Sequence, residues 1–111
     1  MWYIFPQIAG LIPNPTDTST RYAIANLNEA KAYLAHPVLG LRLRECCQSM
    51  LNIDGKSALQ ILGRVDSLKF KSCLTLFARA TDNDQVFGTC LTKYFGNIMD
   101  SNTLALLGTQ T

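Results

Sequence analysis

The spacing of apolar residues constrains the fold of this 111-residue chain more than any other feature of its sequence. Between residues 37 and 95, apolar side chains recur every three or four positions, which places them along one side of an α-helix. No segment alternates apolar and polar residues over a strand's length, as a half-buried strand would. The pattern therefore predicts an all-α fold, a single small domain of about five to six short helices.

Capping residues and turn formers divide the pattern into separate helices. We expect helices over residues 29–36, 37–53, 58–62, 67–80, 85–95 and 102–107. The 37–53 helix is expected to start at Pro37, and the others after a polar side chain that can accept a hydrogen bond from first-turn N–H groups. For five of them this residue is Asn28, Ser57, Asp66, Asp84, and either Asp100 or Ser101. Gly63 and Gly108 are expected to end two of the helices.

The inner faces of the three best-defined helices predict the hydrophobic core. The expected members are Leu43, Cys47, Met50, Leu74, Phe77, Phe87, Cys90, Leu91 and Tyr94. Polar side chains of the 67–80 helix fall on its other side, where we expect them to face solvent. They are Ser72, Thr75 and Arg79.

Composition and charge narrow the class of protein. Hydrophobic residues make up 48% of the chain and charged residues 16%, which excludes a disordered protein. The net charge of +2 comes from scattered side chains, so we expect no nucleic-acid partner and no membrane partner. The opening "MWYIFPQIAG" lacks the basic start of a signal peptide, and Pro6 and Gly10 interrupt it. We expect one domain over residues 1–111, with an apolar stretch and loop over 1–20 and a helical core over 21–108.

The cysteines predict no metal site. Cys46, Cys47, Cys73 and Cys90 include no C-x-x-C pair, and His36 is the single histidine. All four lie on apolar helix faces. We therefore expect buried, reduced thiols in a cytoplasmic protein with no metal and no cofactor.

Four sequence segments carry a resemblance to a known family. The segments "WYIFPQIAGL", "AYLAHPVLG", "KSCLTLF" and "KYF" occur in this order. Together they resemble the uncharacterised family called domain of unknown function 1810, the Rv1873-like family. The resemblance implies a mainly helical, cytosolic domain with no established activity. It also implies a truncated N-terminus, because relatives begin further upstream with an amphipathic helix. Without that helix, we expect possible self-association through exposed apolar side chains, namely Trp2, Tyr3, Ile4 and Phe5.

Four basic side chains are the candidate ligand-binding residues: Lys69, Lys93, His36 and Arg42. His36 is either an acid–base group or a residue that favours the negative end of its helix. Lys69 falls on an apolar helix face, so it reaches solvent past the helix end, pairs with a carboxylate, or binds a ligand anion. Arg42 either pairs with Glu45 on the exposed face or contributes to the same anion site.

Two hypotheses for function follow from these residues. The sequence favours an uncharacterised, non-enzymatic binding or interaction module. The alternative is a small enzyme or binding protein for an anionic, nucleotide-like metabolite, bound in a cleft that Lys69 and Lys93 share. "GKS" at residues 55–57 is no phosphate-binding loop, because Met50 stands where its first glycine would be.

Overall fold

The longest helix, α5 (Arg64–Ala80), lies at the centre of the structure, a computed structural model that describes residues 23–81 and 84–108. Five other helices surround it in the described part of the chain: α2 (Leu27–Ala35), α3 (Leu39–Leu51), α4 (Ala58–Leu62), α6 (Val86–Phe95) and α7 (Ser101–Gly108). These helices confirm the predicted all-α class. One contiguous core joins them, which confirms the single small domain.

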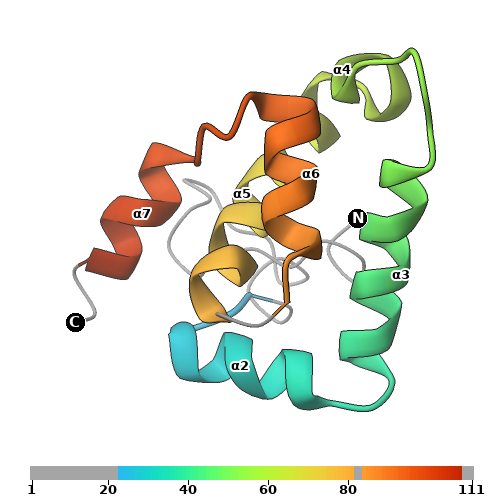
Figure 1. Cartoon of the computed structure of the whole chain (residues 1–111). Helices are drawn as coiled ribbons and strands as arrows, with labels where there is room; N and C mark the ends of the chain where they lie inside the picture. The colour runs from blue at the N-terminus through green and yellow to red at the C-terminus, as the bar shows by residue number, and fades with distance from the viewer. Residues whose placement is uncertain (1–22, 82–83, 109–111) are drawn as a thin grey trace.

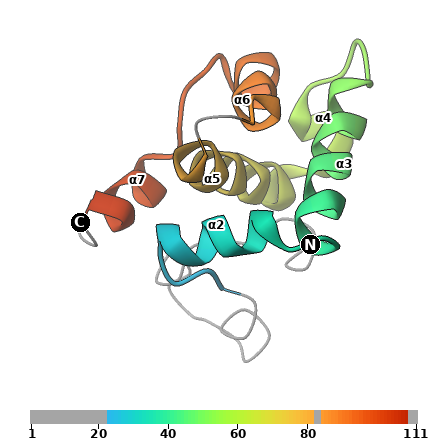
Figure 2. The same cartoon turned by 60° about the horizontal axis from the view of Figure 1, so that its bottom comes forward.

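The helices are stacked around α5 in a simple order (Figures 1 and 2). Figure 2 shows α5 between α6 on one side and α2 on the other, with α3 and α7 at opposite flanks. Helices α2, α4, α6 and α7 pack directly against α5, whereas α3 packs chiefly on α2 and α6. Helix α3 therefore closes one side of the described helices, and no described helix covers its outer surface.

The burial of α5 corrects one sequence-based expectation. Ser72 and Thr75, which we expected in solvent, are buried, and Arg79 alone is exposed as predicted. The reason is that α7 begins over this side of α5, where the Asp100 N–H donates to Thr75 Oγ1 at 2.8 Å. The Ser72 and Thr75 hydroxyls in turn donate to carbonyls one turn earlier in α5. A polar side chain is thus buried here because its hydroxyl is satisfied.

The predicted core residues lie in the core, with one difference in depth. Eight of them are buried and Tyr94 is half-buried at the edge. Phe77 is fully buried, and its ring lies 5.5 Å from the Tyr33 ring and 5.7 Å from the Phe87 ring, centroid to centroid. Phe77 therefore joins α2, α5 and α6 in one aromatic cluster.

Helices α2 and α5 begin two and three residues earlier than predicted. Helix α2 starts at Leu27, because the Asn26 side chain, not Asn28, accepts a hydrogen bond from the Glu29 N–H at 2.9 Å. Helix α5 starts at Arg64, directly after Gly63, whose φ of 84° sets the bend from α4. Asp66 therefore lies in the first turn of α5, where its charge still suits the helix dipole.

The other helix ends show which caps are used. Ser57 caps α4 as predicted, in a capping box with Gln60. Asp100 caps α7, because its carboxylate accepts from the Thr103 N–H at 2.9 Å. Asp84 accepts from the Val86 N–H at 3.3 Å, and it also pairs with Arg44. Helix α3 covers residues 39–51, shorter at both ends than the predicted 37–53.

Gly40 lets α2 and α3 meet closely. A Cβ atom at this buried position would lie 2.1 Å from the Leu34 carbonyl oxygen, far inside van der Waals contact. Only glycine fits between the two backbones. This close approach fixes the corner from which α3 runs past Tyr33.

The predictions for residues 1–20, including self-association through Trp2, Tyr3, Ile4 and Phe5, lie outside the described residues. Within the described ranges, no helix combines the length and the apolar character needed to cross a lipid bilayer.

Candidate functional site

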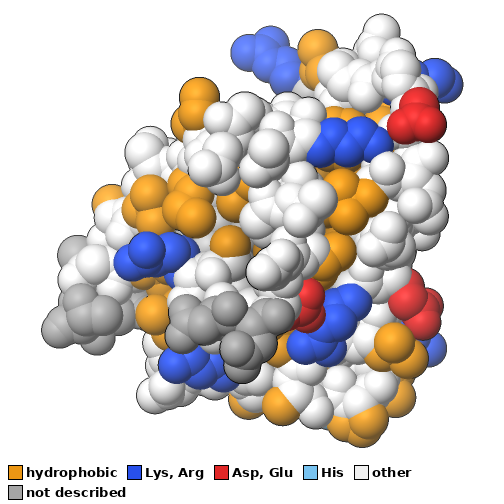
Figure 3. All heavy atoms as spheres, viewed as in Figure 1, with side chains coloured by type: hydrophobic (Ala, Val, Ile, Leu, Met, Phe, Trp, Pro, Cys, Tyr) orange, Lys and Arg blue, Asp and Glu red, His pale blue; other side chains and the backbone are white. Residues whose placement is uncertain are grey.

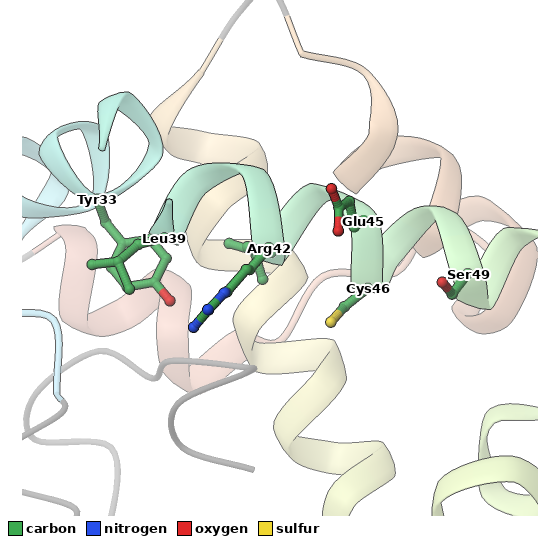
Figure 4. A pocket seen from close by; sticks show the side chains of 7 residues that line it. Tyr33, Leu39, Arg42, Glu45, Cys46 and Ser49 are labelled. Atoms are coloured by element: carbon green, nitrogen blue, oxygen red, sulfur yellow. The ribbon is translucent and has the colours of Figure 1, made fainter. Parts of the chain in front are cut away.

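A groove along α3 is the best-formed concave surface of the described residues. Seven side chains line it: Tyr33 from α2, and Leu39, Arg42, Leu43, Glu45, Cys46 and Ser49 from α3 (Figure 4). We call it the α3 groove; its volume is about 450 Å³. The α3 residues recur every three or four positions, so they form a stripe about 15 Å long on one side of the helix.

The base of the α3 groove is apolar. Leu43 is only 1% exposed there, and Leu39 lies at the mouth with 37% of its surface exposed. The Tyr33 ring forms one wall and is held in place by its contact with Phe77. This base is rigid, because its side chains belong to helices that pack on the core.

Three polar groups of the groove make no hydrogen bond or ion pair with any described residue. They are the Tyr33 hydroxyl, the Arg42 guanidinium and the Ser49 hydroxyl. Figure 4 shows Arg42 extending beside the Tyr33 ring, on the side of α3 where the Cys46 thiol also lies. The Glu45 carboxylate points the other way. The groove thus combines an apolar base with polar groups that are available to a ligand.

Two titratable groups of the groove, the Tyr33 hydroxyl and the Cys46 thiol, stay protonated at neutral pH. Burial raises the pKa of Tyr33, the neighbouring Cys73 and Cys46 thiols raise it further, and the Arg42 charge opposes them. Burial, followed by the nearby Glu45 carboxylate, also raises the pKa of the Cys46 thiol. Arg42 is therefore a positive charge beside two neutral polar groups, while the Glu45 carboxylate points away from them.

His36 has a structural position between two helices. It follows the last residue of α2, and its Nδ1 accepts hydrogen bonds from the N–H groups of Val38 and Leu39, each at 3.1 Å. His36 thus satisfies N–H groups at the start of α3. The sequence placed it correctly at a helix end, but its ring accepts bonds from the next helix through an unprotonated nitrogen.

Lys93 lies at the opposite end of α3. Its Nζ donates to the Leu51 carbonyl at 2.7 Å and to the Ile53 carbonyl, and the Tyr94 hydroxyl donates to the Met50 carbonyl. These bonds satisfy carbonyls that the helix end leaves without partners. Since α3 has 13 residues, His36 and Lys93 are about 20 Å apart.

Of the four candidate residues, Arg42 alone lines the α3 groove. Lys69 is half-buried on α5, one turn before Cys73, and is already engaged in an interaction. The structure therefore does not bring the four basic side chains together. On the face shown in Figure 3, the Lys and Arg side chains are spread out instead of gathered.

The sequence identified part of the groove but not the groove itself. It placed Leu43 and Cys46 on the apolar side of the helix and Arg42 on the exposed face. The missing element was Tyr33, whose position beside α3 depends on the corner at Gly40. The periodicity of apolar residues does not predict how α2 and α3 are arranged at this corner.

The four cysteines are free thiols grouped where α3, α5 and α6 meet. Cys47, Cys73 and Cys90 are buried and Cys46 is half-buried. The Cys90 thiol donates to the Cys47 carbonyl at 3.4 Å. Within the described ranges, no three His, Cys, Asp or Glu side chains are placed to hold a metal ion.

Comparisons with known proteins place the chain in a family. Residues 1–107 match the family model described as protein of unknown function (DUF1810). The structure is similar to the crystal structure of the conserved hypothetical protein Rv1873 from Mycobacterium tuberculosis, with a TM-score of 0.91 and 47% sequence identity. That similarity covers 96% of this chain and 75% of the Rv1873 chain. No curated protein matches the sequence. The chain therefore belongs to the DUF1810 family.

Proposed function

We propose that this domain is a non-enzymatic binding module and that the α3 groove is its contact site. The observation that carries the proposal is the pairing of an apolar base with polar groups that lack described partners. Tyr33, Arg42 and Ser49 supply these groups. Ligand sites in proteins typically combine an apolar lining with a few such polar groups.

The chemistry of the groove supports binding over catalysis. A thiol acts as a nucleophile in its ionised form, and the raised pKa of Cys46 keeps this thiol protonated. The single histidine lies at the corner between α2 and α3, and its Nδ1 already accepts two backbone hydrogen bonds. No described side chain of the groove therefore has the activated partner that covalent catalysis needs.

The alternative, an anionic-metabolite site built from four basic residues, has support only from Arg42. His36 and Lys93 satisfy opposite ends of α3, so neither can reach a ligand held at the other. Of those four residues, Arg42 supplies the one positive charge that lines the groove.

We place this function in the cytoplasm. Four free thiols, three of them buried, suit a compartment that keeps thiols reduced.

A fragment screen by NMR tests the proposal. In a ¹⁵N-labelled sample, fragments should shift the amide resonances of Tyr33 and of residues 39–49 more than those of α7. Leu39→Asp puts a charge at the groove mouth and should abolish these shifts. The matched control is Leu41→Asp, because Leu41 is also exposed on the first turn of α3 but does not line the groove. Hits that avoid the groove, or equal effects of the two variants, would refute the proposal.

A further inference from the structure

We infer that the α3 groove selects ligands that carry an anionic head on an apolar tail. Arg42 and the Tyr33 hydroxyl bind the head, and the tail lies on Leu39 and Leu43. This inference rests on the proposed function of the groove and adds the chemical class of its ligand. Carboxylate and phosphate heads share the required chemistry.

Among the described residues, no carboxylate pairs with the positive charge in the groove. Arg42 and Arg44 lie two residues apart on α3 and differ in their contacts. Arg44 pairs with Asp84, and its guanidinium also donates to the Leu34 carbonyl at 3.1 Å. Arg42 has no such partner among the described residues, and Glu45, one turn further along, points away from it. A guanidinium is permanently charged, and its fork matches the oxygens of a carboxylate or phosphate.

Tyr33 supplies a second donor beside this charge. Its ring is fixed against Phe77, and its hydroxyl makes no hydrogen bond to a described residue. The hydroxyl keeps its proton at neutral pH, so it can donate to an anion. Figure 4 shows the Tyr33 ring and the Arg42 side chain reaching into the same space. Two donors that line the same groove favour an anion over a neutral head.

The apolar base determines the rest of the ligand. Leu39, one turn before Arg42, exposes 37% of its surface, and the buried Leu43 directly after Arg42 closes the base of the groove, so apolar atoms lie beside the charge. Covering this surface releases water and favours a tail over a bare ion. The groove volume of about 450 Å³ accommodates a head with a short chain and one ring.

Three probes with one tail and different heads test the inference. They are 4-phenylbutyrate, 3-phenylpropyl phosphate and the neutral 4-phenylbutyramide, which all carry the 3-phenylpropyl tail. We expect the two anions to bind at least tenfold more tightly than the amide, as measured by NMR titration. Bound anions should also slow the alkylation of Cys46 by iodoacetamide, because Cys46 lines the groove and is the one cysteine that is not buried. The ratio of the two anion affinities identifies the preferred head.

Matched variants assign the effect to the two donors. Arg42→Gln should weaken anion binding about tenfold, the size of one charge-assisted hydrogen bond, and leave amide binding unchanged. Tyr33→Phe keeps the ring against Phe77 and should give a smaller loss in the same direction. Arg64→Gln is the control, because Arg64 is exposed on α5 and does not line the groove.

The outcomes separate the two proposals. If all three probes bind the groove equally and Arg42→Gln changes nothing, the ligand class is wrong and the binding module stands. The same holds if screening fragments occupy the groove but neither anion does. If neither fragments nor probes reach the groove, both proposals fail. Anion binding that Arg64→Gln weakens as much as Arg42→Gln would indicate general charge attraction and overturn the inference.

Discussion

At the scale of single residues, two side chains predicted as ligand-binding residues, His36 and Lys93, instead form hydrogen bonds with backbone groups at helix ends. His36 illustrates this change. Its ring nitrogen satisfies two N–H groups at the start of α3, a task that asparagine or aspartate usually performs. For a polar residue next to a helix end, capping of the helix should therefore be considered before a role in ligand binding.

His36→Ala should lower the free energy of unfolding by about 1 kcal/mol, because the Val38 and Leu39 N–H groups lose their acceptor. His36→Asn restores a side-chain acceptor and should recover most of that loss. Urea denaturation of the three proteins measures the difference. Equal stability of the alanine variant and the parent would show that solvent satisfies these N–H groups equally well.

At the scale of helices, the corner between α2 and α3 depends on the absence of a side chain at Gly40. Gly40→Ala forces a Cβ atom against the Leu34 backbone, so α2 and α3 must move apart. We expect a loss of roughly 1–3 kcal/mol, the usual effect of overpacking. Gly88→Ala in α6 is the control: its Cβ meets nothing within 4 Å, and alanine favours a helix by up to about 1 kcal/mol. Thermal melting should shift in opposite directions for the two variants.

The helices also show how far a sequence can be interpreted alone. Periodicity located every described helix, because burial of one face repeats along the chain. It could not choose between Asn26 and Asn28 as a cap, since both precede the same apolar stripe. It placed Thr75 in solvent because a polar side is normally exposed, and it had no information that α7 covers this side. The groove was missed for the same reason, since it needs Tyr33 from a second helix.

At the scale of the whole molecule, stability depends on a core centred on α5. Phe77→Ala should lower the free energy of unfolding by about 3–5 kcal/mol, because the cavity would lie between α2, α5 and α6. Circular dichroism during heating measures this loss. A melting temperature within a degree or two of the parent would contradict the central role of Phe77.

Burial of a thiol makes the domain less stable at alkaline pH. Burial raises the pKa of the Cys73 thiol above its ordinary value of about 8.5. The hydrogen bond between Cys47 and Cys90 raises the pKa of Cys47 and lowers that of Cys90, so the shifts of this pair oppose each other. The contribution of Cys73 is complete below its ordinary pKa and is lost as pH rises, because the unfolded chain releases this proton first. The free energy of unfolding should therefore fall above about pH 9. Cys73→Ala should reduce the slope by up to about 1.4 kcal/mol per pH unit, whatever its effect at neutral pH.

The enclosure of α5 also determines how the molecule opens. Residues 72–77 are buried around the whole circumference of the helix, and four helices pack against it. No small fluctuation can bring water to these amides, because each side is covered by a different neighbour. Their hydrogen exchange should therefore occur only through complete unfolding, whereas α7, which packs chiefly on α5, can detach and exchange earlier. The slowest amides of α5 would then report the global free energy of unfolding directly, without denaturant.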